Sequence, residues 1–289
     1  MQQNFFVKSH GLGNDYFVLD QENMTFELNE KNIRLLCDVH YGIGSDGILL
    51  KVPSTKADFG LKIYNPDGSE AEKSGNGLRI FAKYLYDYKH TAGKIFTIET
   101  LGGLVTAEVS QEANGKARRV KVDMGKAIFS SRQIPVICDE AECFDHPLNI
   151  IDEAYLINCV SVGNPHCVIL RDPLVKAEIL KHGSDIENHP MFPNRINVQF
   201  AKVLSRNEVE ILIWERGAGY TLASGSSSCA VAAVMVKKGL TDRKLTVKMP
   251  GGVLQLEIDE AWNIRMEGEV KEVASGHLSD QLIAEVLCV

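Results

Sequence analysis

The sequence lacks the features that mark several large classes of protein. Its 289 residues contain no apolar run near the roughly 20 residues of a membrane-spanning helix. The opening stretch, MQQNFFVKSHG, lacks the basic, apolar and small-residue order of a secretory signal. The seven cysteines are odd in number and form no CxxC pair, so neither a disulfide framework nor a structural zinc site is indicated. We expect a cytosolic protein with reduced thiols.

The sequence also lacks an excess of positive charge, since 31 Lys and Arg residues stand against 38 Asp and Glu residues. The formal net charge is −7, and the densest basic cluster, KARRVK at 116–121, lies in an expected strand, where a solvated edge is the simpler interpretation. The composition, 45% hydrophobic and 24% charged, is that of an ordinary globular protein, and the length allows two average domains or one large one. We expect no nucleic-acid partner and no membrane partner, but a small-molecule ligand.

The most informative feature that is present is an internal repeat with a shift of 150 residues. A single shift aligns four short motifs of the first half with four of the second, so chance similarity between unrelated halves is disfavoured. The aligned pairs are Gly13-Asn14 with Gly163-Asn164, Ile63–Asn65 with Ile213–Glu215, Ser74-Gly75 with Ser224-Gly225, and Lys94 with Lys244.

Both halves are therefore expected to contain the same elements. KIFTIET (94–100) and KLTVKM (244–249) alternate apolar and polar residues as half-buried strands do, and a Gly-Gly turn leads each into a second strand. Before them lie two expected helices, LRIFAKYLYDY (78–88) and SCAVAAVMVKKG (228–239), and the second is so apolar that it must be enclosed. We predict an α/β fold of the α+β type, with two pseudo-symmetric lobes that each wrap a mainly antiparallel sheet around a central helix.

The domain boundaries follow from the same repeat. We expect an N-terminal lobe at 1–125, completed by the amphipathic tail at 276–289, and a C-terminal lobe at 126–275. The stretch from about 126 to 152 is expected to be the crossover, and the active cleft is expected between the lobes.

Two matched motifs, SGNGLR and SGSSSC, place Ser74 and Ser224 directly in front of the two expected helices. A helix N-terminus presents unpaired N–H groups and the positive end of the helix dipole, so it suits an anion. Either motif alone also fits an ordinary serine cap. As a pair, the two helix ends would hold one carboxylate from both sides. That arrangement suits proton transfer at both faces of one carbon, with the enolate charge stabilised.

These residues resemble the diaminopimelate epimerase family, which consists of pyridoxal-phosphate-independent isomerases with two pseudo-symmetric lobes. The resemblance covers most of the chain and implies inversion of an amino-acid α-carbon. The specific reaction it implies is conversion of LL- to meso-diaminopimelate in lysine and peptidoglycan precursor synthesis, in a cytoplasmic enzyme that forms homodimers. The motifs that carry it are HGLGNDY (10–16), GIGSDGIL (42–49), NPDGSEAEKSGNGLR (65–79), VGNPHCV (162–168), INVQF (196–200) and ERGAGYTLASGSSSCA (215–230).

The resemblance also implies a set of substrate contacts. Groups at the two helix starts would meet the α-carboxylate, and Arg216, Asn65 and Asn197 would hold the distal polar end. Some family members carry a pocket glutamine where Gly47 stands. The implied substrate-binding residues are Asn14, Asn65, Gly75, Asn76, Asn164, Asn197, Glu215, Arg216, Gly225 and Ser226.

The sequence departs from the family at its two proton-transfer positions, where Ser74 and Ser224 replace the usual cysteines. A thiol titrates near pH 8.5, whereas a serine hydroxyl is a poor base unless another group removes its proton. Lys73, next to Ser74, and His166 are candidate helper bases. Cys229 is five residues beyond Ser224, and we expect it in the core.

Three explanations of the serines stay open. Both cysteines were exchanged deliberately, to trap a complex or to prevent oxidation; or a natural branch uses serine with a helper base; or the protein is a catalytically silent amino-acid-binding homologue. Among enzymes, the alternatives are a racemase of histidine, lysine or ornithine, and an isomerase that moves a double bond in a small carboxylic acid. We expect no metal and no organic cofactor, since the sequence shows neither a metal cluster nor a phosphate loop.

Overall fold

The structure is a computed structural model that describes residues 3–151 and 153–287. The last residue of the expected crossover, at 152, and the last two residues of the expected tail lie outside the described residues. The chain divides into a first unit, Met1–Val122 with Gly268–Val289, and a second unit, Asp123–Glu267. The expected boundary at 275 lies instead inside a strand, β18 (Lys271–His277), which pairs with β1 of the first unit.

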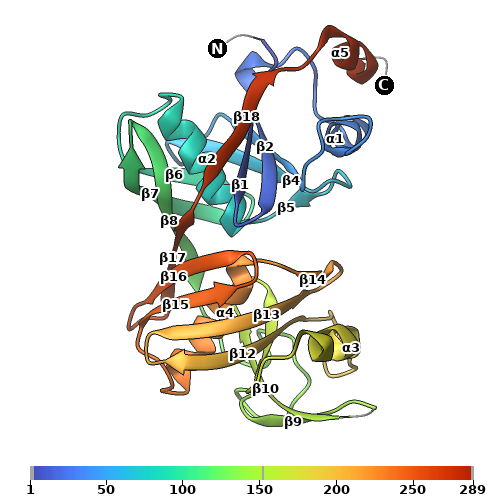
Figure 1. Cartoon of the computed structure of the whole chain (residues 1–289), viewed down its shortest axis with the longest axis vertical. Coiled ribbons are helices and arrows are strands. Elements are labelled where there is room, and N and C mark those ends of the chain that lie inside the picture. The colour runs from blue at the N-terminus through green and yellow to red at the C-terminus, as the bar shows by residue number, and fades with distance from the viewer. Residues whose placement is uncertain (1–2, 152, 288–289) are drawn as a thin grey trace. The chain divides into compact units, whose positions relative to one another are not determined.

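The described part of the first unit is built from nine strands or parts of strands and three α-helices, most of them labelled in Figure 1. The strand pairs β2–β3 and β4–β6 are parallel, and the other described pairs of this unit are antiparallel. The strands are β1 (Phe5–Gly11), β2 (Asn14–Asp20), β3 (Ile48–Val52), β4 (Phe59–Tyr64), β5 (Glu70–Ala71), β6 (Ile95–Thr100), β7 (Gly103–Ala113), β8 (Lys116–Lys126) and β18; the helices are α1 (Glu30–Cys37), α2 (Gly75–Asp87) and α5 (Asp280–Leu287), with a 3-10 turn, η1 (Gln21–Asn23).

The second unit repeats this plan. Its pairs β11–β12 and β13–β15 are parallel, at the places equivalent to β2–β3 and β4–β6, and its other described pairs are antiparallel. The strands are β9 (His146–Asn149), β10 (Ala154–Ser161), β11 (Pro165–Leu170), β12 (Asn197–Ser205), β13 (Glu208–Glu215), β14 (Gly219–Thr221), β15 (Lys244–Met249), β16 (Gly252–Ile258) and β17 (Asn263–Glu269); the helices are α3 (Lys176–Glu187) and α4 (Gly225–Lys237).

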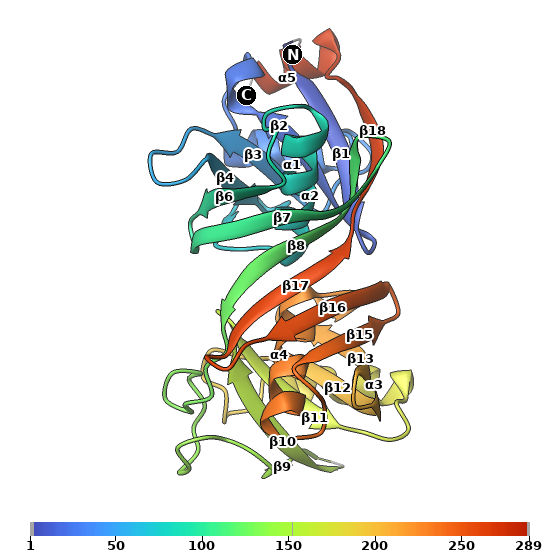
Figure 2. The ribbon, with the colours of Figure 1, turned by 90° about the vertical axis from the view of Figure 1, so that its left-hand side faces the viewer.

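Each unit encloses one helix, as the sequence predicted. Helices α2 and α4 both have 13 residues and start 150 residues apart, each after a serine N-cap. In the first unit α2 packs against β1, β2 and β7, as Figure 2 shows. Phe81 of α2 and Val231 of α4, which are equivalent under the repeat, are both fully buried. Cys229 is also fully buried in α4, which confirms its expected place in the core.

Two helices were not predicted. Helix α1 begins after Asn29, whose side-chain oxygen accepts a 2.8 Å hydrogen bond from the Asn32 N–H, and it buries Ile33 and Leu36. Helix α3 buries Ile179 and Ile186 in the core of the second unit. Each helix turns one apolar side toward its unit, although Leu180 of α3 is exposed. They cover one part of the sheet of their own unit.

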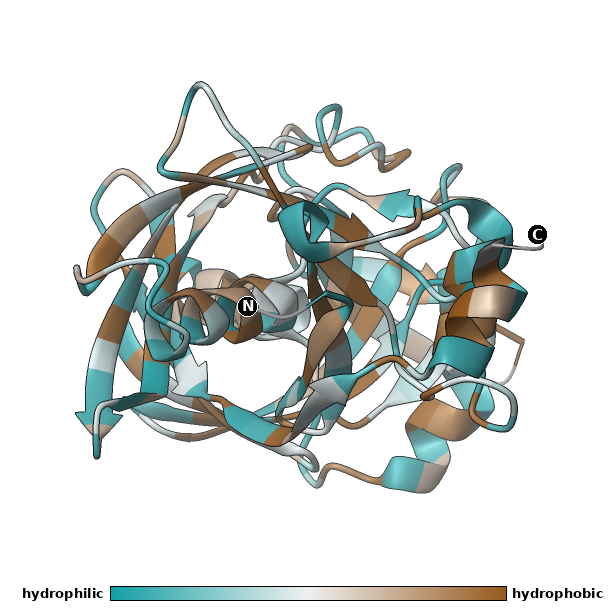
Figure 3. Cartoon of the chain, turned by 90° about the horizontal axis from the view of Figure 1, so that it is seen from above, coloured by the Kyte–Doolittle hydropathy of each residue, from teal (hydrophilic) through white to brown (hydrophobic). Residues whose placement is uncertain are grey.

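The C-terminal helix α5 belongs to the first unit. Val286 and the preceding Leu278 are buried in the cluster that also contains Phe17 and Leu36. Figure 3 shows both hydrophobic and hydrophilic residues on this helix, as its amphipathic sequence requires. The end of the chain therefore completes the unit in which the chain began. None of the helices in the described part of the chain combines the length and the apolarity needed to span a bilayer.

Candidate active site

Ser74 is the N-cap of α2 and lies next to a tyrosine hydroxyl. Its backbone is extended, and its Oγ accepts a 3.1 Å hydrogen bond from the N–H of Gly77, which satisfies one of the open donors of the helix. The same Oγ lies 3.1 Å from Oη of Tyr16, a residue of β2 whose side chain is only 7% exposed. The hydroxyl of Ser74 is thus held between a backbone donor and a phenol.

Two glycines leave room for this arrangement. A Cβ added at Gly77 would lie 3.2 Å from Oγ of Ser74, and one at Gly47 would lie 2.9 Å from Cε1 of Tyr16 and 2.5 Å from the carbonyl oxygen of Tyr64. A side chain at either position would therefore push Ser74 or the Tyr16 ring away. The glutamine that some family members carry at the position of Gly47 does not fit this arrangement.

The start of α2 is tied to the β1–β2 hairpin by two predicted substrate contacts. The amide of Asn76 donates a 3.1 Å hydrogen bond to Oδ1 of Asn14, whose own amide donates to Asp46 at 2.9 Å. The fully buried guanidinium of Arg79 donates to Oδ1 of Asn76 at 2.8 Å and to the carbonyl of Gly75 at 3.2 Å. The buried positive charge lies one turn from the helix start, where it favours a bound anion.

The first unit holds three more of the predicted residues, which are Gly75, Lys73 and Asn65. Gly75 is buried in the first turn of α2, and Lys73 is half-buried immediately before Ser74. Asn65 lies in the turn from β4 to β5, where its amide donates a 3.0 Å hydrogen bond to Oγ of Ser69.

Ser224 is the N-cap of α4 and is 5% exposed. Its Oγ accepts a 3.4 Å hydrogen bond from the N–H of Ser227 and lies 3.4 Å from Oγ of Ser226. Burial raises the pKa of the Glu215 carboxyl, at the end of β13, and the nearby Ser224 hydroxyl partly offsets that rise. A carboxyl able to accept a proton therefore lies near Ser224.

His166 is fully buried on β11, and its Nε2 lies 2.9 Å from Oδ1 of Asn164. The amide of Gln199, fully buried on β12, donates to Oγ of Ser227 at 3.0 Å. Burial lowers the pKa of His166 to about 3, so the imidazole is neutral at physiological pH. A neutral imidazole with so low a pKa holds Asn164 in place more readily than it accepts a proton.

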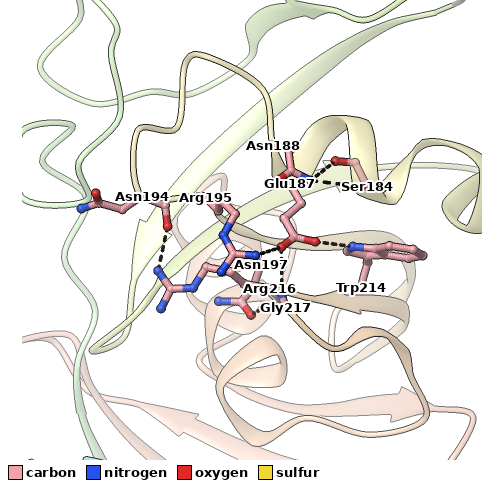
Figure 4. A network of polar contacts seen from close by, with 9 residues as sticks. All are labelled: Ser184, Glu187, Asn188, Asn194, Arg195, Asn197, Trp214, Arg216 and Gly217. Atoms are coloured by element: carbon pink, nitrogen blue, oxygen red, sulfur yellow. Dashed lines mark hydrogen bonds and ion pairs between the residues drawn. The ribbon is translucent and has the colours of Figure 1, made fainter.

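A buried carboxylate organises the segments that carry Asn197 and Arg216 (Figure 4). Glu187, at the end of α3, accepts hydrogen bonds from the Trp214 indole at 2.8 Å, from the N–H of Gly217 at 2.8 Å and from Arg195 at 3.1 Å. Glu187 is 5% exposed, so these three hydrogen bonds offset the cost of burying its polar side chain.

The two predicted substrate contacts meet next to this carboxylate. Oδ1 of Asn197 accepts a 3.1 Å hydrogen bond from the backbone N–H of Arg216, and the amide of Asn197 donates to the carbonyl of Pro165 at 2.9 Å. The exposed guanidinium of Arg216 donates to the carbonyl of Asn194 at 2.9 Å. Arg216 is thus fixed at its backbone and keeps donors for a ligand carboxylate.

The structure forms two local groups from the predicted residues. In the first unit Asn14, Asn76 and Ser74 gather at the start of α2; in the second, Glu215 and Ser226 lie beside Ser224, after which Gly225 begins α4. The sequence reasoning missed the contacts of four buried side chains, although all but Glu187 stand inside quoted motifs. The four are Tyr16, Arg79, Glu187 and Gln199.

Comparison with known proteins identifies one family over most of the chain. The sequence profile described as "Diaminopimelate epimerase" matches residues 6–130 and 158–273. A protein named "Diaminopimelate epimerase 2" from Nostoc sp. is 48% identical over 280 residues, which cover 96% of this chain and 97% of that protein. A "Diaminopimelate epimerase" from Acetivibrio thermocellus is 40% identical over 274 residues, which cover 94% of this chain and 98% of that protein.

Solved structures with low sequence identity share the fold. A probable proline racemase from Agrobacterium radiobacter has a TM-score of 0.71 at 13% identity, covering 96% of this chain and 93% of that one. A hydroxyproline epimerase from Agrobacterium vitis has a TM-score of 0.70 at 13% identity, covering 95% and 90%. A methylitaconate-delta-isomerase has a TM-score of 0.63 at 12% identity, covering 95% and 94%. At such identities these likenesses establish the architecture alone.

Proposed function

This chain belongs to the diaminopimelate epimerase family, and from that premise we propose that it inverts the α-carbon of diaminopimelate, interconverting the LL- and meso-forms without pyridoxal phosphate. The observation that carries the proposal is the pair of serine-capped helices, which start 150 residues apart inside a family frame matched over most of the chain. Ser74 and Ser224 then serve opposite faces of one α-carbon.

The two helix starts supply the donors that the α-carboxylate needs. Each serine caps the third N–H of its helix, that of Gly77 or Ser227. The N–H groups of the two residues before each of these point the same way from the helix end and suit a carboxylate. Removal of the α-proton places negative charge on that carboxylate, so the same donors stabilise the enolate more than the substrate.

Proton transfer at Ser224 uses Glu215. A serine hydroxyl takes an α-proton only if its own proton leaves at the same time, and the Glu215 carboxyl lies near enough to Ser224 to be affected by its hydroxyl. The raised pKa of the carboxyl brings it nearer to the working pH, which improves a general base. We therefore assign the helper-base role on this side to Glu215 rather than to His166.

The distal end of the substrate is assigned to Arg216 and Asn197. Diaminopimelate differs from lysine by a second carboxylate on the distal carbon, and a guanidinium binds a carboxylate through two parallel hydrogen bonds. The Glu187 carboxylate holds the segment of Arg216 through Gly217 and Trp214, so the guanidinium starts from a fixed backbone. This pairing is the reason to prefer diaminopimelate to a monocarboxylic amino acid.

The proposal is tested by proton exchange. The protein is incubated with LL-diaminopimelate in D₂O, and the α-proton signal is followed by NMR, with the double variant Ser74→Cys/Ser224→Cys in parallel. We expect exchange by the protein itself, and loss of exchange in Glu215→Gln. Exchange by the double variant only would show that the frame binds diaminopimelate while its serines do not transfer protons. No exchange by either protein would overturn the substrate assignment.

Two further properties belong to the same proposal. We propose that the enzyme works in the cytoplasm, where lysine and peptidoglycan precursors are made, and that two copies associate as a homodimer. Light scattering coupled to size-exclusion chromatography measures the mass directly, since one chain is 31.9 kDa. A mass of one chain at micromolar concentration would contradict the dimer.

A further inference from the structure

We propose that Tyr16 is the titrating partner of Ser74, so that proton transfer on this side runs through a Tyr16–Ser74 pair. The inference rests on the proposed function and adds to it a residue that acts through Ser74 and does not itself touch the substrate. Tyr16 is therefore a positioning residue that also exchanges a proton with Ser74.

The geometry of the pair is specific. Oη of Tyr16 lies 3.1 Å from Oγ of Ser74, and that Oγ already accepts a 3.1 Å hydrogen bond from the N–H of Gly77. A hydroxyl offers one proton and two acceptor positions. When Tyr16 donates to Ser74, both acceptor positions of Ser74 are filled, and its own proton is the one left to point at a substrate.

The phenol of Tyr16 compensates for the high pKa of the serine hydroxyl. An isolated serine hydroxyl titrates far above physiological pH, whereas a phenol has a pKa near 10. If Ser74 gives its proton to the α-carbanion and takes the proton of Tyr16 in the same step, the negative charge ends on a phenolate and not on an alkoxide. The N–H of Gly77 and the start of α2 stabilise Oγ during that transfer.

In the second unit, the partner of the serine comes from a different position of the repeat. Under the shift of 150 residues, His166 is the equivalent of Tyr16, and Asn65 is the equivalent of Glu215. Each serine therefore has one acidic side chain against it, and these come from non-equivalent positions: a phenol from β2 for Ser74 and a carboxyl from β13 for Ser224. The two partners differ in pKa, so the halves are chemically distinct although their frames match.

The protons balance over one turnover. On one face the α-proton goes to Oγ of Ser224, and the proton of Ser224 goes to the carboxylate of Glu215. On the other face the proton of Ser74 goes to the α-carbon, and the proton of Tyr16 goes to Oγ of Ser74. The substrate keeps its composition, and the enzyme is left with a protonated Glu215 and a phenolate at Tyr16. Water returns the proton from the carboxylic acid to the phenolate, which is downhill because the phenol has the higher pKa.

The space for Tyr16 is built into the fold. A Cβ at Gly47 would lie 2.9 Å from Cε1 and 3.3 Å from Cδ1 of the Tyr16 ring, closer than ordinary van der Waals contact. The ring is 7% exposed, so it has no free solvent region into which to move. Glycine at position 47 therefore permits the ring position from which Oη reaches Ser74.

The test uses a thiol as a reporter and needs no turnover. In a Ser74→Cys variant, the pKa of the introduced thiol is measured from the pH dependence of its alkylation by iodoacetamide, quantified on the peptide that contains residue 74. Donation from Oη stabilises the thiolate, so adding Tyr16→Phe is expected to raise that pKa by about one unit, or to slow alkylation roughly tenfold below it. Tyr88→Phe, which removes a hydroxyl bonded to Glu272 in the same unit, is the matched control and is expected to change nothing.

A second variant tests the position of the ring while keeping its hydroxyl. Gly47→Ala retains Tyr16 but crowds its ring, together with the carbonyl oxygen of Tyr64, so it is expected to raise the thiol pKa in the same direction as Tyr16→Phe. An unchanged thiol pKa in Tyr16→Phe, with native near-ultraviolet circular dichroism, would overturn the inference even if the protein epimerises diaminopimelate. Conversely, failure of α-proton exchange by every variant would contradict the proposed function. The thiol pKa would still test the contact between Tyr16 and Ser74.

Discussion

Nε1 of Trp214 donates a 2.8 Å hydrogen bond to the carboxylate of Glu187, which joins the end of α3 to β13. The same carboxylate accepts the N–H of Gly217, next to the residue we assign to the distal carboxylate. The hydrogen bond between Trp214 and Glu187 therefore belongs to the core and also holds the segment that carries Arg216. Its removal is expected to affect stability and substrate affinity together.

Replacing Glu187 by alanine is expected to lower the free energy of unfolding by about 3 kcal/mol, because the Trp214 indole and the Gly217 N–H lose their acceptor. It is also expected to raise KM for diaminopimelate more than it lowers kcat. Urea unfolding and initial-rate kinetics measure the two effects. The control is Glu187→Gln, whose remaining oxygen accepts one of these hydrogen bonds and so loses less stability. Equal effects of both variants would contradict the network.

Glu215→Gln is expected to reduce α-proton exchange by about 10²–10⁴-fold, the usual contribution of a general base. Exchange by the unsubstituted protein is expected to fall as the pH drops through the pKa of Glu215, because only the carboxylate accepts the Ser224 proton. Burial raises that pKa, so the loss begins at a higher pH than for an exposed glutamate. Glu210→Gln, on the exposed side of the same strand, is the control. An unchanged exchange rate in Glu215→Gln would remove this residue from the mechanism.

The buried His166 is expected to make stability depend on pH. The unfolded imidazole takes a proton near pH 6.5, whereas burial keeps the folded one neutral down to about pH 3. Between these values the unfolded state binds one more proton, so the free energy of unfolding falls by about 1.4 kcal/mol for each unit of pH decrease. His166→Gln is expected to flatten that slope, and His40→Gln, an exposed control, to leave it unchanged. Urea unfolding at several pH values measures this dependence. Equal slopes of the free energy of unfolding against pH in all three proteins would contradict the role of His166.

Truncating one buried side chain is expected to lower the free energy of unfolding more in α2 than in α4. Phe81→Ala removes a fully buried ring from α2 and is expected to cost about 3–5 kcal/mol, whereas Val231→Ala, at the equivalent place in α4, removes two methyl groups and is expected to cost about 2 kcal/mol. Hydrogen exchange of amides in each unit measures the loss where it occurs. A smaller loss for Phe81→Ala than for Val231→Ala would mean that its site collapses around the cavity.

The helix starts were predictable from the sequence because capping is local. Serine, followed within three residues by the N–H it caps, is a short-range signal, and the repeat supplied the same signal twice. The enclosed helices were predictable because a run such as AVAAVMV has no polar face to expose. The strands that follow alternate in the same way in both halves, but Ile95 corresponds to Lys244 there, so the repeat slips by one residue.

The partners of the two serines were not predictable in the same way. Tyr16 reaches Ser74 from 58 positions away, and only the register of β2 in its sheet decides which side of the strand its ring takes. Glu215 was assigned to the substrate, and its contact with Ser224 depends on where β13 ends. Helix α1 was missed because its eight residues give too few turns for a periodic signal.

The C-terminal strand and helix have a consequence for the order in which the protein is made. The ribosome finishes the second unit, Asp123–Glu267, before it releases β18 and α5, which supply part of the first unit's sheet and core. The first unit therefore cannot complete its sheet at the edge of β1 at that stage, whereas the second unit already has all its residues. Nascent chains stalled with residue 267 just outside the exit tunnel should protect the later half from protease and leave the earlier half open to cleavage.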